Sequence, residues 1–345
     1  MVKHVIISIV LFSLLFTPSF SQNHVSIIES LEWNSVNDPA LVNDSELISK
    51  LSNEFILFKG GLILRPKDKV EFGGLSALWV SENGKELIAI SDYSSKSKYK
   101  NEYKSQWFQF NLNYDENYQL VNAEIYNKGQ LSNPKAKVIS GEIESIAWDQ
   151  KKFYLSFDGS NQVFSYDINS LKKDENSFLP QSILHLKPNF PNIFNGGIEA
   201  MTATSDSLLL AIYEKNDKQA FRDAWLLNPR TDTCKYFKYF TDIEDVKGAT
   251  TLLNGDIIVV EKSYDAPHTR LKLRLINKND LGSDDIRAQE ILYIESDALD
   301  NFEGIASYSM NGREYLLLIS DDNGDRHSRQ QTILLHFELL LNNKK

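Results

Sequence analysis

The 345-residue sequence contains a single cysteine, Cys234, so no intramolecular disulfide can form. It also lacks any apolar run long enough to cross a membrane, because the N-terminal apolar stretch is only about a dozen residues. With 42% hydrophobic residues, the chain can still bury a substantial core. Stability must therefore come from packing, and we expect a soluble mature chain.

An excess of positive charge is absent too. The formal net charge is −10, which argues against nucleic acids and anionic membrane surfaces as partners because both require basic patches. Cations, or anions bridged by cations, suit such a chain better. The alternative is that the negative charge only keeps an exported protein soluble.

Three common catalytic signatures are missing as well. The sequence has no G-x-S-x-G elbow, no P-loop and no H-E-x-x-H. Cys234 lies in a strand pattern and is interpreted as a core residue, not a nucleophile. The acidic residues are therefore the main candidates for chemistry.

The N-terminus has the pattern of a secretory signal peptide. Lys3 and His4 precede the apolar stretch Val5–Phe16, and the small residues Ser19 and Ser21 follow. We expect cleavage after Ser21, a secreted or periplasmic mature protein, and no membrane insertion after cleavage. An uncleaved signal-anchor is the alternative. Residues 22–54 show no strong period and are interpreted as a lead-in to one domain, residues 55–345.

Five copies of one unit occupy most of this domain. Each copy has a strand rich in small residues, followed by a strongly apolar strand that ends in an acid. The copies are Gly73–Trp79 with Leu87–Asp92, Glu144–Trp148 with Phe153–Asp158, Glu199–Thr202 with Leu208–Glu214, Lys247–Leu252 with Ile257–Glu261, and Phe302–Ala306 with Tyr315–Asp321.

The strand pattern predicts an all-β fold, a β-propeller of five four-stranded blades. The second strands are apolar on both faces, as in Leu208–Ile212, whereas Arg270–Leu275 alternates and fits an outer strand. The last unit has only three strands, so we expect Phe55–Leu64 to pair with Thr332–Leu339 and close the ring. Six blades remain the alternative if the lead-in or Lys96–Lys104 hides one, and a two-sheet sandwich is the other. We expect a monomer.

Two sets of acids recur at fixed places in the unit. Glu144, Glu199 and Glu303 occupy one slot of the first strand, where Ser76 and Lys247 stand in the other copies. First strands line the channel of a propeller, so we expect these side chains to converge near its axis. The second set closes the second strands: Asp92, Asp158, Glu214, Glu261 and Asp321, with Asp322 after the last. Turn formation explains some of them, such as Asp158 before Gly159.

Converging carboxylates repel one another, and a hard cation bound by oxygen ligands relieves that repulsion. We expect a divalent cation, calcium first, held by Asp92, Asp158, Glu214, Glu261, Asp321 and Asp322. The run Asp321–Asp325 has the oxygen density of a calcium loop but does not match an EF-hand.

Several phrases of the sequence resemble the family named for the "esterase-like activity of phytase". These are Phe72–Ser76, Gly141–Ala147, Asn195–Ala200, Asn301–Ala306 and Leu318–Asn323, and the resemblance covers roughly residues 57–339. The resemblance implies an exported β-propeller with phosphodiesterase or phosphatase activity, and it points to Glu144, Glu199, Glu303, Asp92, Asp321 and Asp322. Where that family often has Glu-Arg, this chain has Glu261 and Lys262.

These observations lead to two competing hypotheses. The first is an exported, metal-dependent phosphoesterase acting on a small phosphorylated substrate, with Glu144, Glu199 and Glu303 as catalytic residues. Its phosphate-binding candidates are Lys262, Arg326 and Arg329. The second is a non-catalytic propeller that binds a ligand or partner and uses its acids for structure.

Overall fold

The computed structural model describes residues 25–27, 29–31, 49–65, 72–92, 105–131, 142–167, 182–186, 196–214, 220–242, 245–265, 268–296, 299–322 and 330–341. The predicted signal peptide, residues 1–21, and the stretch 96–104 lie outside these residues. Within the described residues, no helix is both long and apolar enough to span a membrane.

The described strands form five sheets. The innermost strand of each sheet contains one of the predicted first strands. Blade 1 consists of β4 (Leu75–Val80), β5 (Glu86–Ser91), β6 (Ser105–Tyr114) and β7 (Leu120–Leu131), with β1 (Val25–Ile27) at its outer edge. Blade 2 consists of β8 (Ile143–Trp148), β9 (Lys152–Phe157), β10 (Gln162–Asp167) and β11 (Ser182–His185).

Blade 3 contains β12 (Ile198–Ala203), β13 (Leu209–Tyr213), β14 (Phe221–Asn228) and β15 (Thr233–Phe240). A 3₁₀ helix at Lys278–Gly282 leads to β19 (Asp285–Arg287), which joins this blade parallel to β15. Blade 4 contains β16 (Asp245–Thr251), β17 (Ile257–Asp265), β18 (His268–Ile276) and β20 (Gln289–Ser296).

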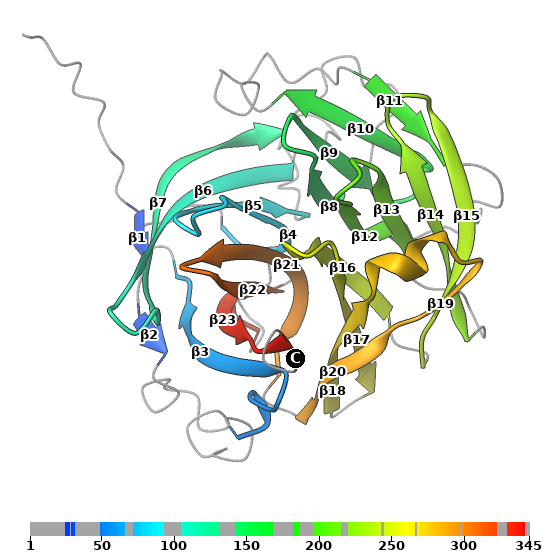
Figure 1. The fold of residues 1–345 in the computed structure, drawn as a ribbon. Helices are drawn as coiled ribbons and strands as arrows, with labels where there is room; N and C mark the ends of the chain where they lie inside the picture. Colours follow the sequence, from blue (N-terminus) through cyan, green and yellow to red (C-terminus); the bar gives the residue numbers. More distant parts are fainter. Residues whose placement is uncertain are drawn as a thin grey trace, which may run out of the picture.

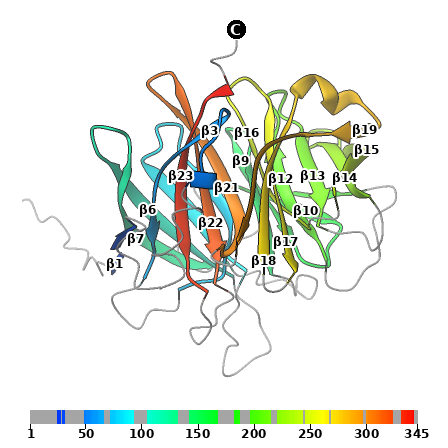
Figure 2. The ribbon, with the colours of Figure 1, turned by 90° about the horizontal axis from the view of Figure 1, so that it is seen from below.

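Blade 5 combines both ends of the domain. Its strands are β21 (Asn301–Met310), β22 (Arg313–Asp321), β23 (Ile333–Leu339), β3 (Ile56–Ile63) and β2 (Glu29–Leu31). β3 pairs antiparallel with β23, for example Leu62 opposite Leu334, so the predicted closure of the ring is confirmed. Figure 2 shows these two strands beside each other.

The inner strands β4, β8, β12, β16 and β21 contact one another in a closed cycle, as Figure 1 shows. The described residues therefore form a five-bladed propeller. The six-blade and sandwich alternatives are wrong for this part of the chain. The lead-in is more than a linker, because β1 extends blade 1 and β2 extends blade 5.

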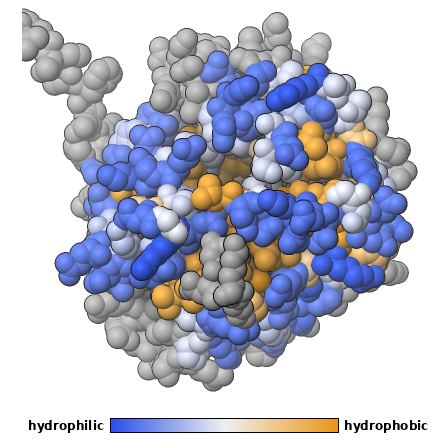
Figure 3. All heavy atoms as spheres, viewed as in Figure 1, coloured by the Kyte–Doolittle hydropathy of each residue, from blue (hydrophilic) through white to orange (hydrophobic). Residues whose placement is uncertain are grey.

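The core lies between neighbouring blades. All five residues of β13 are buried, as expected for a strand packed between two sheets. One cluster joins Leu210 and Ile212 of blade 3 to Ile257 and Val259 of blade 4, and another joins blade 5 to blade 1. In Figure 3, hydrophilic side chains cover most of the rim, with hydrophobic side chains visible between them.

Every inner strand carries a β-bulge at the same place. The register with the second strand skips one residue in each blade, and these bulge residues are Ser76, Glu144, Glu199, Lys247 and Glu303. A bulge residue is unpaired in the ladder, and the bulge redirects its side chain. The slot inferred from the repeats is thus a structural feature of all five blades.

Candidate functional site

The five bulge residues surround the axis of the propeller. Ser76, Glu144, Glu199 and Lys247 line a small central cavity of about 10 Å³, together with small and apolar residues of the inner strands. Glu303 joins them through Lys247, whose Nζ lies 3.6 Å from Glu303 Oε1. The sequence-based expectation that these slots converge therefore agrees with the geometry, whereas catalytic roles for the three glutamates stay a prediction.

Lys247 is the main counter-ion of this centre. Its Nζ lies 2.5 Å from Glu199 Oε2 and 2.6 Å from Glu214 Oε1, and the lysine is only 8% exposed. Burial alone lowers the pKa of Lys247, but the carboxylates of Glu199, Glu303 and Glu214 raise it well above its ordinary value. Burial still raises the pKa of Glu199 well above the usual range, although Lys247 acts against that shift.

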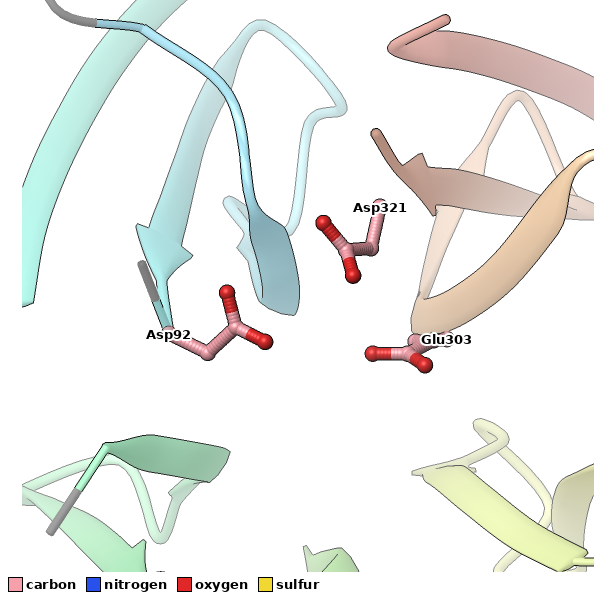
Figure 4. A group of neighbouring side chains, drawn as sticks. All are labelled: Asp92, Glu303 and Asp321. Carbon is pink, nitrogen blue, oxygen red and sulfur yellow. The ribbon is translucent and has the colours of Figure 1, made fainter. Parts of the chain in front are cut away.

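Two further carboxylates join Glu303 at the junction of blades 5 and 1. Asp92 follows β5, Glu303 lies on β21 and Asp321 ends β22, and each offers an oxygen within 4.8 Å of the other two. Figure 4 shows these three side chains around one space. We call Asp92, Glu303 and Asp321 the acid triad.

The acid triad is electrostatically strained. Burial, followed by the charges of Asp321 and Glu303, raises the pKa of Asp92 from 3.8 to about 9. For Glu303, burial raises the pKa, but Lys247 and Lys262 outweigh it and leave the pKa below its ordinary value. Asn301 Nδ2 donates to Glu303 Oε1 at 3.0 Å and to Asp321 Oδ2 at 3.1 Å. One neutral amide thus bridges two of the three acids.

The spacing of the acid triad fits a hard cation. A calcium ion has oxygen ligands at about 2.3–2.6 Å, so two oxygens on opposite sides of it are separated by about 4.6–5.2 Å. The oxygens of the triad lie within 4.8 Å of one another, below the largest separation that one such ion spans. Carboxylate oxygens also select Ca²⁺, Mg²⁺ or Mn²⁺ over softer metals. Among the described residues, this is the one group of acids with such spacing.

Glu144 has a different environment from the other axial glutamates. It is half-buried and lines the central cavity. Burial, then the charges of Glu199 and Asp92, raises its pKa well above the ordinary value. A carboxyl group with a raised pKa is suited to general acid chemistry.

The structure does not bring the remaining predicted ligands into the acid triad. Glu214 pairs with Lys247, and Asp158 is half-buried at the end of β9, where its backbone N–H donates to the Glu142 carbonyl at 2.9 Å. Glu261 is fully buried between Tyr239, whose hydroxyl donates to it at 2.7 Å, and Arg274 Nε at 2.8 Å. These contacts give Glu214 and Glu261 structural partners within the protein.

Asp322 connects blade 5 to blade 1. Its Oδ1 accepts from the Gly74 backbone N–H at 2.7 Å, and its Oδ2 accepts from the Thr332 hydroxyl at 3.1 Å. Gly73 has a φ of 131° and lies so close to this carboxylate that a Cβ there would overlap it. The contacts of Asp322 thus favour a role in ring closure.

Of the predicted phosphate-binding residues, Lys262 is described and lies beside the acid triad. Its Nζ is 3.4 Å from Glu303 Oε1. Arg326 and Arg329 lie outside the described residues.

Two residues of the site had no role in the sequence-based hypothesis. The sequence shows Lys247 only as an exception at a position that is Glu in three of the five copies. This reversal of charge is the signal that could have identified it as a counter-ion. Asn301, two residues before Glu303 and on the same strand, bridges two triad acids. An asparagine at the start of a strand carries no comparable sequence signal.

A model of the phytase-like family, described as "Esterase-like activity of phytase", matches residues 70–324. None of the curated proteins compared matches the chain. Among solved structures, the chain is similar to glutaminyl cyclase of Myxococcus xanthus, with 10% identity and a TM-score of 0.43 over 81% of this chain and 96% of that chain.

Two other solved structures are similar to the chain, with comparable identities and TM-scores. The PQQ-bound aldose sugar dehydrogenase of Streptomyces coelicolor has 11% identity and a TM-score of 0.44, covering 81% of this chain and 98% of that chain. Virginiamycin B lyase of Staphylococcus aureus has 10% identity and a TM-score of 0.44, covering 82% and 94%. Likenesses this distant carry no argument about activity.

Proposed function

The chain belongs to the phytase-like family, described by the esterase-like activity of phytase, and from this premise we propose that it is an exported, metal-dependent phosphoesterase. The observation that carries the proposal is the acid triad, in which three carboxylates from blades 1 and 5 offer oxygens within 4.8 Å of one another. Burial and the charges of Asp321 and Glu303 raise the pKa of Asp92, which is the repulsion that a cation relieves. A divalent cation, calcium first, would balance that charge.

In this proposal each residue has a separate task. Asp92, Glu303 and Asp321 would hold the cation, and Asn301 would orient the latter two carboxylates. When bound, such an ion polarises phosphoryl oxygens and lowers the pKa of an attacking water. Lys262 would add a positive charge for a phosphate oxygen, as a point charge and not as a bidentate contact. Glu144, whose pKa is raised by burial and by the charges of Glu199 and Asp92, would donate a proton to the departing oxygen.

The test is hydrolysis of p-nitrophenyl phosphate and bis(p-nitrophenyl) phosphate by EDTA-treated protein, with and without added Ca²⁺, Mg²⁺ or Mn²⁺. We expect turnover with at least one ion. Asp321→Asn and Glu303→Gln should reduce it by the order of 10²-fold or more, as does removal of other groups that stabilise transition-state charge. Glu338→Gln is the matched control, because Glu338 is a buried glutamate that pairs with Arg313 in blade 5.

A second candidate is the non-catalytic binding propeller. It is favoured by the partners that Glu199, Glu214, Glu261 and Asp322 already have within the protein. Absence of turnover with every ion and both substrates would contradict the enzyme proposal and favour this one.

We also propose that the protein is exported, secreted or periplasmic. The support is the N-terminal sequence, with Lys3 before the apolar stretch Val5–Phe16. N-terminal sequencing of the mature protein should give Gln22 as its first residue. A mature protein that retains residues 1–21 would contradict cleavage.

A further inference from the structure

His336 is a titratable side chain enclosed between blades 5 and 1. It lies on β23, which closes the ring by pairing with β3, and it is fully buried. Its ring centroid lies 5.3 Å from that of Tyr114 on β6 of blade 1. Within blade 5, it lies 5.2 Å from the ring centroid of Tyr315 and 5.9 Å from that of Tyr308. His336 can therefore reach water only if this packing opens.

The hydrogen bonds around His336 suit a neutral ring. Its Nε2 lies 2.7 Å from the Tyr308 hydroxyl oxygen. Its Nδ1 is buried and has no hydrogen-bond partner among the residues that the structure describes. A protonated ring carries a hydrogen on both nitrogens, so it would bury a charge and an N–H without an acceptor.

The charged and titratable groups on the neighbouring strands do not favour a protonated ring either. These groups are Tyr114 of β6, Tyr308 of β21, Tyr315 and Arg313 of β22, Lys59 of β3 and Glu338 of β23. Burial raises the pKa values of the three tyrosines, which therefore stay uncharged. Glu338 is paired with Arg313 at 3.2 Å and with Lys59 at 3.9 Å. Burial, followed by the charge of Lys59, lowers the pKa of His336 from 6.5 to about 3.

The backbone pairing that closes the ring is interrupted at the same residue. Leu335 lies opposite Gly61 and Phe337 opposite Phe58, so two residues of β3 oppose the single residue His336. One of the two is Gly60, which has a φ of 96°. An extra residue in a bulge is unpaired in the ladder. The closing ladder therefore has a discontinuity beside the buried imidazole.

We propose that His336 is an acid-sensitive latch of the ring-closing junction. While the ring is neutral, blades 5 and 1 pack around it, and its protonation favours the state in which they separate and the ring meets water. Asp92 of blade 1 and Asp321 of blade 5 meet across the same junction, so this opening would also separate the acid triad. The proposal does not depend on the phosphoesterase activity.

The direction and size of the effect follow from the two states of the histidine. In the open state the ring has its ordinary pKa of 6.5, and in the closed state the pKa is about 3. The open state therefore binds the proton more readily, and the contribution of His336 to closure is lost as the pH falls from 6.5 toward 3. Through this residue alone, the equilibrium constant for opening should be about 100-fold larger at pH 4.5 than at pH 7.5.

The test is hydrogen exchange of the backbone amides of β3 and β23, followed by mass spectrometry in wild type and His336→Gln at pH 7.5 and pH 4.5. Glutamine does not titrate and can still accept a hydrogen bond from Tyr308. We expect the ratio of wild-type to variant exchange rates to rise by about 100-fold between the two pH values. The axial acids titrate in both proteins, so their effect cancels in this ratio. An equal ratio at both pH values would overturn the proposal.

Two matched controls and one internal reference make the result specific. Tyr308→Phe removes the hydrogen bond to Nε2 but keeps the histidine, so it should keep the acid response. His185→Gln removes a half-buried histidine of blade 2, whose Nδ1 lies 3.5 Å from Asp232 Oδ2, and should exchange like wild type. The ratio in β13 of blade 3 should stay constant. An equal rise in β13 would contradict a local latch, because it would mean that the whole domain opens.

A measurement on wild type alone decides the question if His336→Gln does not fold. The carbon chemical shifts of the His336 ring report its protonation in the folded protein. We expect a neutral ring at pH 4.5. A ring that is protonated at pH 4.5 while the protein stays folded and the junction closed would overturn the latch.

Discussion

Asp92 shows how a single side chain links the axial site to stability. Burial and the charges of Asp321 and Glu303 raise its pKa to about 9 in the folded protein without a cation, whereas an unfolded aspartate has a pKa of about 3.9. The folded state therefore holds a proton that the unfolded state releases. This contribution to stability is fully present below pH about 4 and is lost as the pH rises toward about 9.

We predict that the melting temperature in EDTA falls as the pH rises across this window. Asp92→Asn should make the decrease smaller, because asparagine does not titrate. Glu144 and Glu199, whose pKa values are also raised, should keep part of the slope. Thermal melts of both proteins from pH 5 to pH 9 in EDTA check this, and equal slopes would contradict the assigned environment of Asp92.

Glu261 tests whether a recurrent acid is structural. Its carboxylate is fully buried and pairs with Arg274 Nε at 2.8 Å. Arg274→Met should lower the free energy of unfolding by about 3–5 kcal/mol, because it leaves a buried charge uncompensated. The double variant Glu261→Leu with Arg274→Met should recover most of that loss, since an apolar pair often replaces a buried ion pair without cost. Chemical denaturation measures the free energy of unfolding of both variants. A much smaller loss for Arg274→Met alone would contradict the structural role of Glu261.

At the scale of strands, ring closure depends on how closely β3 approaches β23. A Cβ at Gly61 would lie 2.9 Å from the Leu334 carbonyl oxygen and 2.9 Å from Leu335 Cδ2. Gly61→Val should therefore destabilise the protein by about 1–3 kcal/mol through overpacking. Gly282→Ala is the control, because a Cβ there meets nothing within 4 Å. A chemical denaturation midpoint for Gly61→Val equal to that of the control would contradict close pairing at this position.

The strands themselves could be predicted because their patterns are local. The alternation Arg270–Leu275 falls within β18, the third strand of blade 4, where Lys272 and Arg274 are buried, and the doubly apolar run Leu208–Ile212 overlaps the buried strand β13. β19 had no such signal, because Asp285–Arg287 is short and its charged residues flank a single apolar one. Its parallel pairing with β15 depends on the chain path through the preceding 3₁₀ helix.

At the scale of the whole molecule, the sequence repeats predicted the positions of the axial residues but not the residues with which they interact. Aligning the five units gave the positions of Glu144, Glu199 and Glu303, and the structure places a bulge at each. Which acid meets which cation depends on packing between blades. Glu199 and Lys247 are 48 residues apart, and Asp92 meets Asp321 only because the ring closes.

The acids that end the second strands differ in the charges they meet. Glu261 and Glu214 end second strands, as Asp92 and Asp321 do, yet they face Arg274 and Lys247. Alignment of the repeats places all these acids at one position and does not distinguish them. Glu261 meets Arg274 on the adjacent strand of its own blade, whereas Glu214 meets Lys247 of the next blade.

The central claim is that the acid triad binds a divalent cation, and the most direct measurement is the melting temperature of wild type and Asp321→Asn in EDTA and in millimolar Ca²⁺. An ion that binds only the native state stabilises it by about 2.7 kcal/mol at 100 times its dissociation constant. We predict a higher melting temperature in Ca²⁺ for wild type and little or no increase for Asp321→Asn. A wild-type melting temperature that is the same in EDTA and Ca²⁺, and that Mg²⁺ and Mn²⁺ also leave unchanged, would contradict the account.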